Sequence, residues 1–141
     1  MKKLKKKIKV TIEKTNSGYS AYANKLSVYS TAENIDQLSY NLVEALNLYY
    51  EDSGTYVDHD NIVLHLDIAQ FFKEYRVLNA KFLAARIGMN PVLLSQYVQG
   101  NKVPSHKQVL KIVEGIHDIG KELSGLKLTW QKRRFSLSDK R

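Results

Sequence analysis

Asp58, His59 and Asp60 place two carboxylates on either side of an imidazole, a set of groups that could bind a metal ion or act as an acid and a base. They follow one another in a loop before a strand-like run. Adjacent side chains of an extended segment point in opposite directions, so three in a row seldom converge on one ion. We therefore expect a solvated loop, and we expect neither catalysis nor a metal or cofactor in this chain.

A second stretch, GMNPVLLSQYVQGNKVPS (residues 88–105), joins a glycine, an apolar run with polar residues spaced through it, and a polar loop. Two interpretations fit it: a helix that lies in a DNA groove, and an ordinary core helix followed by a loop. Asn90 is a favoured N-cap residue, and Pro91 suits the first helical turn, where its missing N–H costs no hydrogen bond. The pattern predicts a helix from Pro91 to about Val98 and leaves both interpretations open.

Three further helices are predicted around this one. Each has a residue that favours the N-cap position, followed by apolar residues at helical spacing. Gly88 supplies the positive φ that a sharp helix end requires. The predicted caps and inward-facing residues are Asp67 with Ile68, Phe71, Phe72 and Tyr75; Asn79 with Leu83, Ala84 and Ile87; and Ser105 with Val109, Ile112, Val113 and Ile116.

Residues 8–67 have the pattern of a sheet covered by one helix. Apolar residues alternate at 8, 10 and 12, residues 15–19 suit a tight turn, and residues 19–23 can return antiparallel. A third strand is predicted at 25–30 and a fourth at 61–67, in which we expect His65 to be half exposed. Ser30 and Glu33 have the spacing of a capping box, and the helix after them is predicted to run to about Asp52. Its apolar stripe is Ile35, Leu38, Leu42, Ala45, Leu46 and Tyr49.

The chain of 141 residues is therefore predicted to be α+β with two small domains. An N-terminal β-β-β-α-β sheet with one covering helix should occupy residues 1–66, and four to five short helices should occupy residues 67–126. Residues 127–141 should form a basic strand or tail. Because the sequence has no cysteine, no secretory apolar segment and no apolar run long enough to span a membrane, we expect a soluble cytoplasmic protein.

The net charge of +8 is unevenly distributed along the chain. Residues 1–9 carry six lysines, residues 10–67 have a net charge of −7, residues 68–126 of +4, and residues 127–141 of +5. The acidic segment should repel nucleic acid, whereas the basic segments suit phosphate. For the N-terminal lysines we favour protection of a strand edge from pairing with other chains, with a weak DNA contact as the alternative.

The segment FLAARIGMNPVLLSQYVQGNKVPS (residues 82–105) resembles the XRE-type (Cro and repressor) helix-turn-helix motif. The residues at the spacings of that motif are Leu83, Ala84, Gly88, Leu94, Ser95, Gly100 and Pro104. The resemblance implies that the helix beginning at Pro91 enters the major groove of DNA. It also implies that Pro91, Val92 and Gln96 form the exposed edge of this helix, with Leu93 at its margin.

Each residue of that implied edge has a definite capability. Gln96 can form two hydrogen bonds to adenine, one through its side-chain oxygen and one through its NH2 group. Val92 and Leu93 can touch thymine methyl groups. Asn101 and Lys102 can bind DNA phosphates. Such contacts position a protein on DNA without reading its sequence. The DNA-binding residues that the resemblance implies are Lys81, Asn90, Pro91, Val92, Leu93, Gln96, Asn101 and Lys102.

Residues 9–52, KVTIEKTNSGYSAYANKLSVYSTAENIDQLSYNLVEALNLYYED, are similar to the HicB-type antitoxin fold. VLKIVEGIHDIGKELSGLKL (residues 109–128) is similar to the ending of HicB-type proteins that carry a C-terminal helix-turn-helix. The resemblance covers about residues 8–128. It implies an acidic domain that binds and blocks a small basic HicA-like toxin, which cleaves RNA, and a basic domain that represses the shared operon as a homodimer or higher homo-oligomer.

Two other hypotheses stay open. A phage-like XRE-family repressor without a toxin partner would use its N-terminal domain to oligomerise or to sense another ligand. A nuclease or metal enzyme would use Asp58, His59 and Asp60. Leu126, Leu128 and Trp130 could add a strand at a dimer contact.

Overall fold

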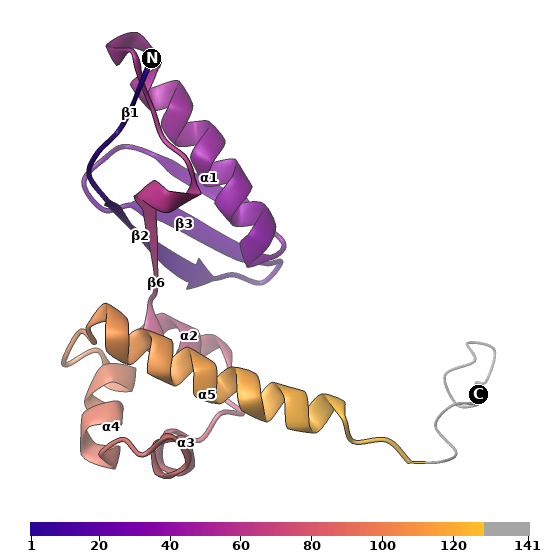
Figure 1. Ribbon diagram of the computed structural model, residues 1–141. Coiled ribbons are helices and arrows are strands. Elements are labelled where there is room, and N and C mark those ends of the chain that lie inside the picture. The colour runs from indigo at the N-terminus through magenta and orange to yellow at the C-terminus, as the bar shows by residue number, and fades with distance from the viewer. Residues whose placement is uncertain (129–141) are drawn as a thin grey trace.

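The computed structural model describes residues 1–128, and the fold is α+β, as the sequence patterns predict. Figure 1 shows the sheet with helix α1 in one half of the molecule and helices α2, α3, α4 and α5 in the other. Of the predicted strand or tail at 127–141, only Lys127 and Leu128 are described, and neither is in a strand; Trp130 lies outside the described residues. Among residues 1–128, no helix is long and apolar enough to cross a membrane.

The main sheet has the strand order β4-β3-β2-β6. Its strands are β2 (Ile8–Lys14), β3 (Tyr19–Ala23), β4 (Tyr29–Ala32) and β6 (Ile62–Leu66). Strands β2, β3 and β4 pair antiparallel through short turns, whereas β6 pairs parallel to β2 after a crossover that contains α1 (Ile35–Tyr50). The predicted order of three strands, a helix and a strand is confirmed in this sheet.

One face of the sheet packs against α1 and forms the core of this half. Alternation along β2 puts Ile8, Val10 and Ile12 on one face, and β6 adds Leu64 beside Val10 and Leu66 beside Ile12. From the helix, Leu38, Leu42 and Leu46 are each fully buried. The period of two on the strands and the helical period on α1 therefore meet in one apolar layer.

Two local predictions in this half are wrong. The third strand begins at Tyr29 rather than at residue 25, because residues 24–28 form the turn, in which the Ala23 N–H donates to the Val28 carbonyl over 2.9 Å. Ser30 therefore lies inside β4 and cannot cap the helix. Asn34 is the cap instead, and its side chain accepts from the backbone N–H at position 37 over 2.8 Å.

Four predictions of exposure are also wrong, one of them in the helical half, where Tyr75 was predicted to face inward but is 37% exposed. Ile35 and Tyr49, at the two ends of the predicted apolar stripe, are 37% and 50% exposed. His65, predicted to be half exposed, is only 5% exposed. The burial of His65 comes from tertiary packing. His65 lies on the sheet face opposite α1, where helix α5 of the other half packs against β6.

Two of the N-terminal lysines, Lys2 and Lys3, form a short strand that the sequence patterns do not predict. Strand β1 (Lys2–Lys3) pairs in parallel with β5 (Thr55–Tyr56), which follows α1 and the 3-10 turn η1 (Glu51–Ser53). The Lys2 N–H donates to the carbonyl of Gly54 over 3.0 Å. The start of the lysine run is therefore paired with the segment that follows α1, and not with the main sheet.

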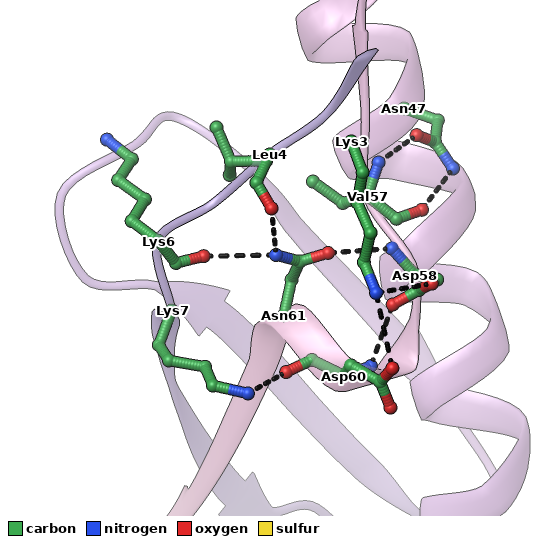
Figure 2. Close-up of polar contacts among 9 residues, drawn as sticks. All are labelled: Lys3, Leu4, Lys6, Lys7, Asn47, Val57, Asp58, Asp60 and Asn61. Atoms are coloured by element: carbon green, nitrogen blue, oxygen red, sulfur yellow. Dashed lines mark hydrogen bonds and ion pairs between the residues drawn. The ribbon is translucent and has the colours of Figure 1, made fainter.

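Asn61 fixes the chain that leads from β1 to β2, as Figure 2 shows. It ends the 3-10 turn η2 (His59–Asn61) and is 4% exposed. Its side-chain NH2 donates to the carbonyls of Leu4 over 2.8 Å and Lys6 over 3.0 Å, and its side-chain oxygen accepts from the Asp58 N–H over 3.1 Å. One buried amide therefore satisfies three backbone groups.

The helical half contains α2 (Ile68–Glu74), α3 (Ala80–Ile87), α4 (Pro91–Gln99) and α5 (His106–Ser124). All four predicted caps are confirmed, because each side chain accepts from a backbone N–H in the first turn: Asp67, Asn79, Asn90 and Ser105. With 19 residues, α5 is longer than the short helices predicted, and its end projects beyond the other helices in Figure 1.

The two halves are joined without a linker. Strand β6 ends one residue before Asp67, which caps α2 and whose own N–H donates to the carbonyl of Ile12 over 2.8 Å. The Gln70 side chain accepts from the Lys14 N–H over 2.7 Å and donates to the Lys14 carbonyl over 2.5 Å. The Lys14 ammonium lies over the rings of Tyr19 and Tyr75, 5.3 and 5.8 Å from their centroids. This junction holds α2 against the end of β2.

We predict that Asn61→Ala lowers the free energy of unfolding by about 1–3 kcal/mol, because it leaves buried backbone groups without partners. Asp60→Ala is the matched control in the same turn; its side chain is 79% exposed, so the change should stay within about 0.5 kcal/mol. Urea denaturation measures both, and amide exchange of residues 2–4 should rise only in Asn61→Ala. Equal effects of the two substitutions would contradict this role of Asn61.

Candidate nucleic-acid interface

The turn between α3 and α4 is a Schellman motif built on a glycine. Gly88 has φ +68°, a left-handed conformation that costs glycine no steric strain. Its N–H donates to the Ala85 carbonyl over 3.4 Å, and the Met89 N–H donates to the Ala84 carbonyl over 2.9 Å. Met89 and Ala84 are both buried, which adds the apolar contact typical of this motif. The turn therefore fixes the angle at which α4 leaves α3.

Asn90 and Gly100 define the two ends of α4. The Asn90 side-chain oxygen accepts from the Val92 N–H over 2.8 Å, and Pro91 occupies the first turn. Gly100, with φ +82°, ends the helix, and the Asn101 N–H donates to the Gln96 carbonyl over 2.9 Å. The helix extends one residue past the predicted end at Val98. Asn90 thus has a structural role, since its side-chain oxygen is already used as the cap.

The inner side of α4 anchors it in the core of the helical half. Leu94 has no exposed surface and Tyr97 is 7% exposed. They pack with Leu83 and Ala84 of α3 and with buried residues of α2 and α5 in one cluster. The placement of Leu94 inside agrees with the register that the XRE resemblance implies.

The outer side of α4 presents the residues expected to touch bases. Pro91 is exposed, and Val92 is 67% exposed. Gln96 is half-buried, and its side-chain amide has no hydrogen-bond partner within residues 1–128. Leu93 is partly buried and packs against the core, so less of it is free to meet a base than of Val92. This side of the helix combines one free amide with an exposed branched side chain.

Ser95 and Gln99 lie on the same side as Val92, three and seven residues further along, and the sequence reasoning missed both. The Gln99 amide donates to the Ser95 hydroxyl over 3.3 Å, and the Asn101 amide donates to the Gln99 side-chain oxygen over 3.2 Å. Asn101, expected to hold phosphate, is therefore bonded to the helix in this state. The helical spacing from Val92 is the signal that would have found Ser95 and Gln99.

Lys102 and Lys81 are the basic residues expected at this surface, and both are exposed. Lys102 follows Asn101 in the loop after α4, and Lys81 lies in the first turn of α3. Within residues 1–128 neither ammonium forms an ion pair. Both charges are thus available to phosphate.

Asp58 and Asp60 are held by a lysine, whereas His59 between them is not. The Lys3 ammonium lies 2.9 Å from Asp58 Oδ2 and 3.2 Å from Asp60 Oδ2 (Figure 2), and its hydrogen bond lowers the pKa of the Asp58 carboxyl. The His59 ring instead packs edge-on against Tyr40, with centroids 5.1 Å apart. Among residues 1–128, no three His, Asp or Glu side chains are grouped so that they could hold a metal ion. We expected a solvated loop here. The loop also has a structural role, because the Asp58 side chain caps η2.

The outer side of α1 is a second surface that exposes acidic and large apolar side chains. Asp36, Tyr40, Glu44 and Leu48 follow at four-residue intervals and are all exposed, Tyr40 by 65% and Leu48 by 68%. We call these four residues the acidic face. It combines two carboxylates with two large apolar side chains, a composition typical of protein-binding surfaces rather than of nucleic-acid contacts.

Comparisons with known proteins find no match among family models, curated proteins or solved structures. The XRE-type and HicB-type resemblances therefore rest on the residues quoted above. DNA reading by the helix from Pro91 and toxin binding by the acidic N-terminal domain stay predictions.

We predict that Gly115→Ala lowers the free energy of unfolding by about 1–3 kcal/mol, because the added Cβ would overlap Ile87 Cγ2 and push α5 away from α3. The matched control in the same helix is Gly120→Ala, whose Cβ would meet nothing within 4 Å. That variant should be stabilised by about 0.5–1 kcal/mol. Thermal or urea denaturation measures both; changes of the same sign would contradict the close approach of α3 and α5.

Proposed function

We propose that this chain is a sequence-specific DNA-binding autorepressor and an antitoxin that acts in the cytoplasm without enzymatic activity. The observation that carries the proposal is the outer side of α4, where an exposed Val92 and the Gln96 amide lie next to Lys102, the last two without a side-chain partner within residues 1–128. Amide, branched apolar and basic groups are the three kinds of contact that base edges, thymine methyls and phosphates require.

The dimensions and the caps of α4 support insertion into the major groove. An α-helix with its side chains is about 10–12 Å across, and the major groove of B-DNA is about 12 Å wide, so α4 can lie in it. The Asn90 cap and Pro91 hold the first turn in helical geometry before DNA arrives. Little conformational entropy would then be lost at the end of the helix that enters the groove first.

We propose that the repressor acts as a homodimer or a higher homo-oligomer. Two-fold dimers of helix-turn-helix proteins read half-sites about one helical turn, roughly 34 Å, apart. Past the packed part of α5, Leu123 and Leu126 are 66% and 69% exposed. Apolar side chains in this position support contact with a second copy, which would cover them.

The acidic face supports the antitoxin part of the proposal. The HicB resemblance implies a small basic toxin as the partner, and complementary charge speeds encounter and disfavours wrong partners. Tyr40 and Leu48 would supply the apolar contacts that the charges alone do not. If the gene has no neighbouring basic protein as partner, the phage-like repressor without a toxin is the function that remains.

For the DNA surface, we predict that Gln96→Ala weakens binding to the operator by about 1–3 kcal/mol and relaxes the preference at one base pair. Lys102→Ala should instead weaken binding to all sequences alike and reduce the slope of log affinity against log salt by about one. Fluorescence anisotropy with operator variants at several salt concentrations measures both effects.

The matched controls for these variants are Gln108→Ala on α5 and Lys73→Ala on α2, which should leave affinity and salt slope nearly unchanged. A Gln96→Ala variant with wild-type affinity and base preference would show that the outer side of α4 is not the reading surface. A promoter footprint without a protected inverted repeat would argue against the dimeric repressor as a whole.

For the acidic face, we predict that Glu44→Lys combined with Leu48→Ala weakens binding to the co-expressed neighbouring basic protein at least tenfold, through charge repulsion and lost apolar contact. Operator affinity should not change. The control Glu114→Lys makes the same charge change on α5 and should leave the protein partner bound. Calorimetric titration measures the affinities, and an equal loss in both variants would point to net charge rather than to the acidic face.

A further inference from the structure

A cavity of about 350 Å³ lies between the sheet half and the helical half. Its walls include Lys9 and Thr11 of β2, His65 of β6, and the loop after α4 with Lys102. In the β2–β6 register Thr11 pairs with His65, so these residues share the sheet face opposite α1. Its volume is in the range of small-molecule sites, which are concave and often lie between domains.

A second cavity of about 470 Å³ adjoins the first and shares Lys9 and Asn24 with it. Lys6, Lys7 and Lys25 line it together with Leu26 and Tyr50. We call the two together the lysine cavities. Lys9 belongs to the walls of both, between Lys6 and Lys7 in one cavity and Lys102 in the other.

The charges around the lysine cavities are almost all positive. Lys6, Lys7, Lys9, Lys25 and Lys102 line them, and none of these ammonium groups forms an ion pair within residues 1–128. The only carboxylate in the walls belongs to Asp67, which is engaged in capping α2. Because like charges repel, an anion in this position would stabilise the arrangement.

Neutral donors accompany these charges. The Thr11 hydroxyl donates to the Asn24 side-chain oxygen over 2.7 Å, which leaves the Asn24 NH2 group free to donate to a ligand. His65 is 5% exposed, and its Nδ1 has no hydrogen-bond partner in the described chain. Buried polar atoms rarely stay unpaired in native proteins. Burial and the nearby Lys9 and His106 lower the pKa of His65, against an opposing effect of Asp67. The unpaired Nδ1 can donate to an anion in the tautomer that carries the ring proton on this nitrogen.

We propose that the lysine cavities bind a small multiply charged oxyanion, a phosphorylated or polycarboxylated metabolite, and that its binding releases the operator. The second part rests on the proposed DNA-binding function. The anion would engage Lys9, Asn24 and Lys102, with His65 as a buried donor. Lys102 would then be withdrawn from the DNA phosphates, and by linkage the operator and the anion would weaken each other by the same factor.

Calorimetric titration of the full chain with tripolyphosphate and with citrate tests the binding step. We expect saturable binding of one anion per chain, and the stronger of the two identifies the class as phosphate or carboxylate. Lys9→Gln should weaken it at least tenfold, whereas Lys5→Gln, which removes a charge outside both cavities, should not. In NMR spectra the His65 ring signals should shift on binding, and those of the exposed His117 should stay in place. Equal losses in both variants, or binding that does not saturate, would overturn the site.

The regulatory step is tested by operator binding with and without the anion. We expect the anion to weaken operator binding about fivefold or more in the wild type and to have no effect in Lys9→Gln. If Lys9→Gln alone weakens operator binding and lowers the salt slope by about one, the lysine cavities extend the DNA contact and the metabolite site is refuted. Anion binding by a chain that shows no operator affinity would refute the proposed function while leaving the anion site in place.

Discussion

The two hydrogen bonds between the Gln70 side chain and the Lys14 backbone set the geometry on which the functional surfaces depend. Each such bond contributes about 1 kcal/mol net, and the Lys14 ammonium over Tyr19 and Tyr75 adds about 0.5–1 kcal/mol per contact. Since strand β6 passes into α2 through Asp67 alone, there is no linker in which the halves could swing. The outer side of α4 therefore keeps a defined position relative to the sheet.

This junction also explains why a titratable side chain is buried without a partner. Once the helical half covers the sheet face opposite α1, His65 loses water, and within residues 1–128 its Nδ1 gains no hydrogen bond. The same closure brings Lys9 of the sheet half and Lys102 of the helical half to the walls of one cavity. Neither half alone would contain this set of groups, so the cost of burying His65 and the positive charge of the cavity have one structural origin.

The helix caps and the glycine turn of the helical half were predictable from the sequence, whereas the local prediction of a Ser30 cap in the sheet half was wrong. The Asn90 cap and the Gly88 turn involve backbone groups within five residues, so residue type and spacing are sufficient to place them. Asn61 bonds to the carbonyl of Leu4, 57 residues away, and no local pattern indicates that partner. The prediction that His65 is half exposed failed for the same reason, because residues of the other half of the chain bury it.

In the candidate site, too, some features were predictable from residue spacing and others were not. The exposure of Pro91 and Val92 follows from the helical period and from the inward Leu94, and was predicted. Asn101 was expected to be free for phosphate, but its amide is bonded to Gln99, a side chain that the prediction did not include. Side-chain hydrogen bonds along a helix depend on rotamers, which residue spacing does not specify.

The small number of free polar groups on α4 limits what one copy could read. A bidentate contact such as that available to Gln96 discriminates between bases by about 1–3 kcal/mol, whereas specific DNA binding usually exceeds non-specific binding by about 4–10 kcal/mol. Apolar contact from Val92 adds to this but does not supply the difference. If α4 reads DNA as proposed, two copies on adjacent half-sites would double the number of base contacts, so the composition of α4 favours the proposed dimer over a single copy.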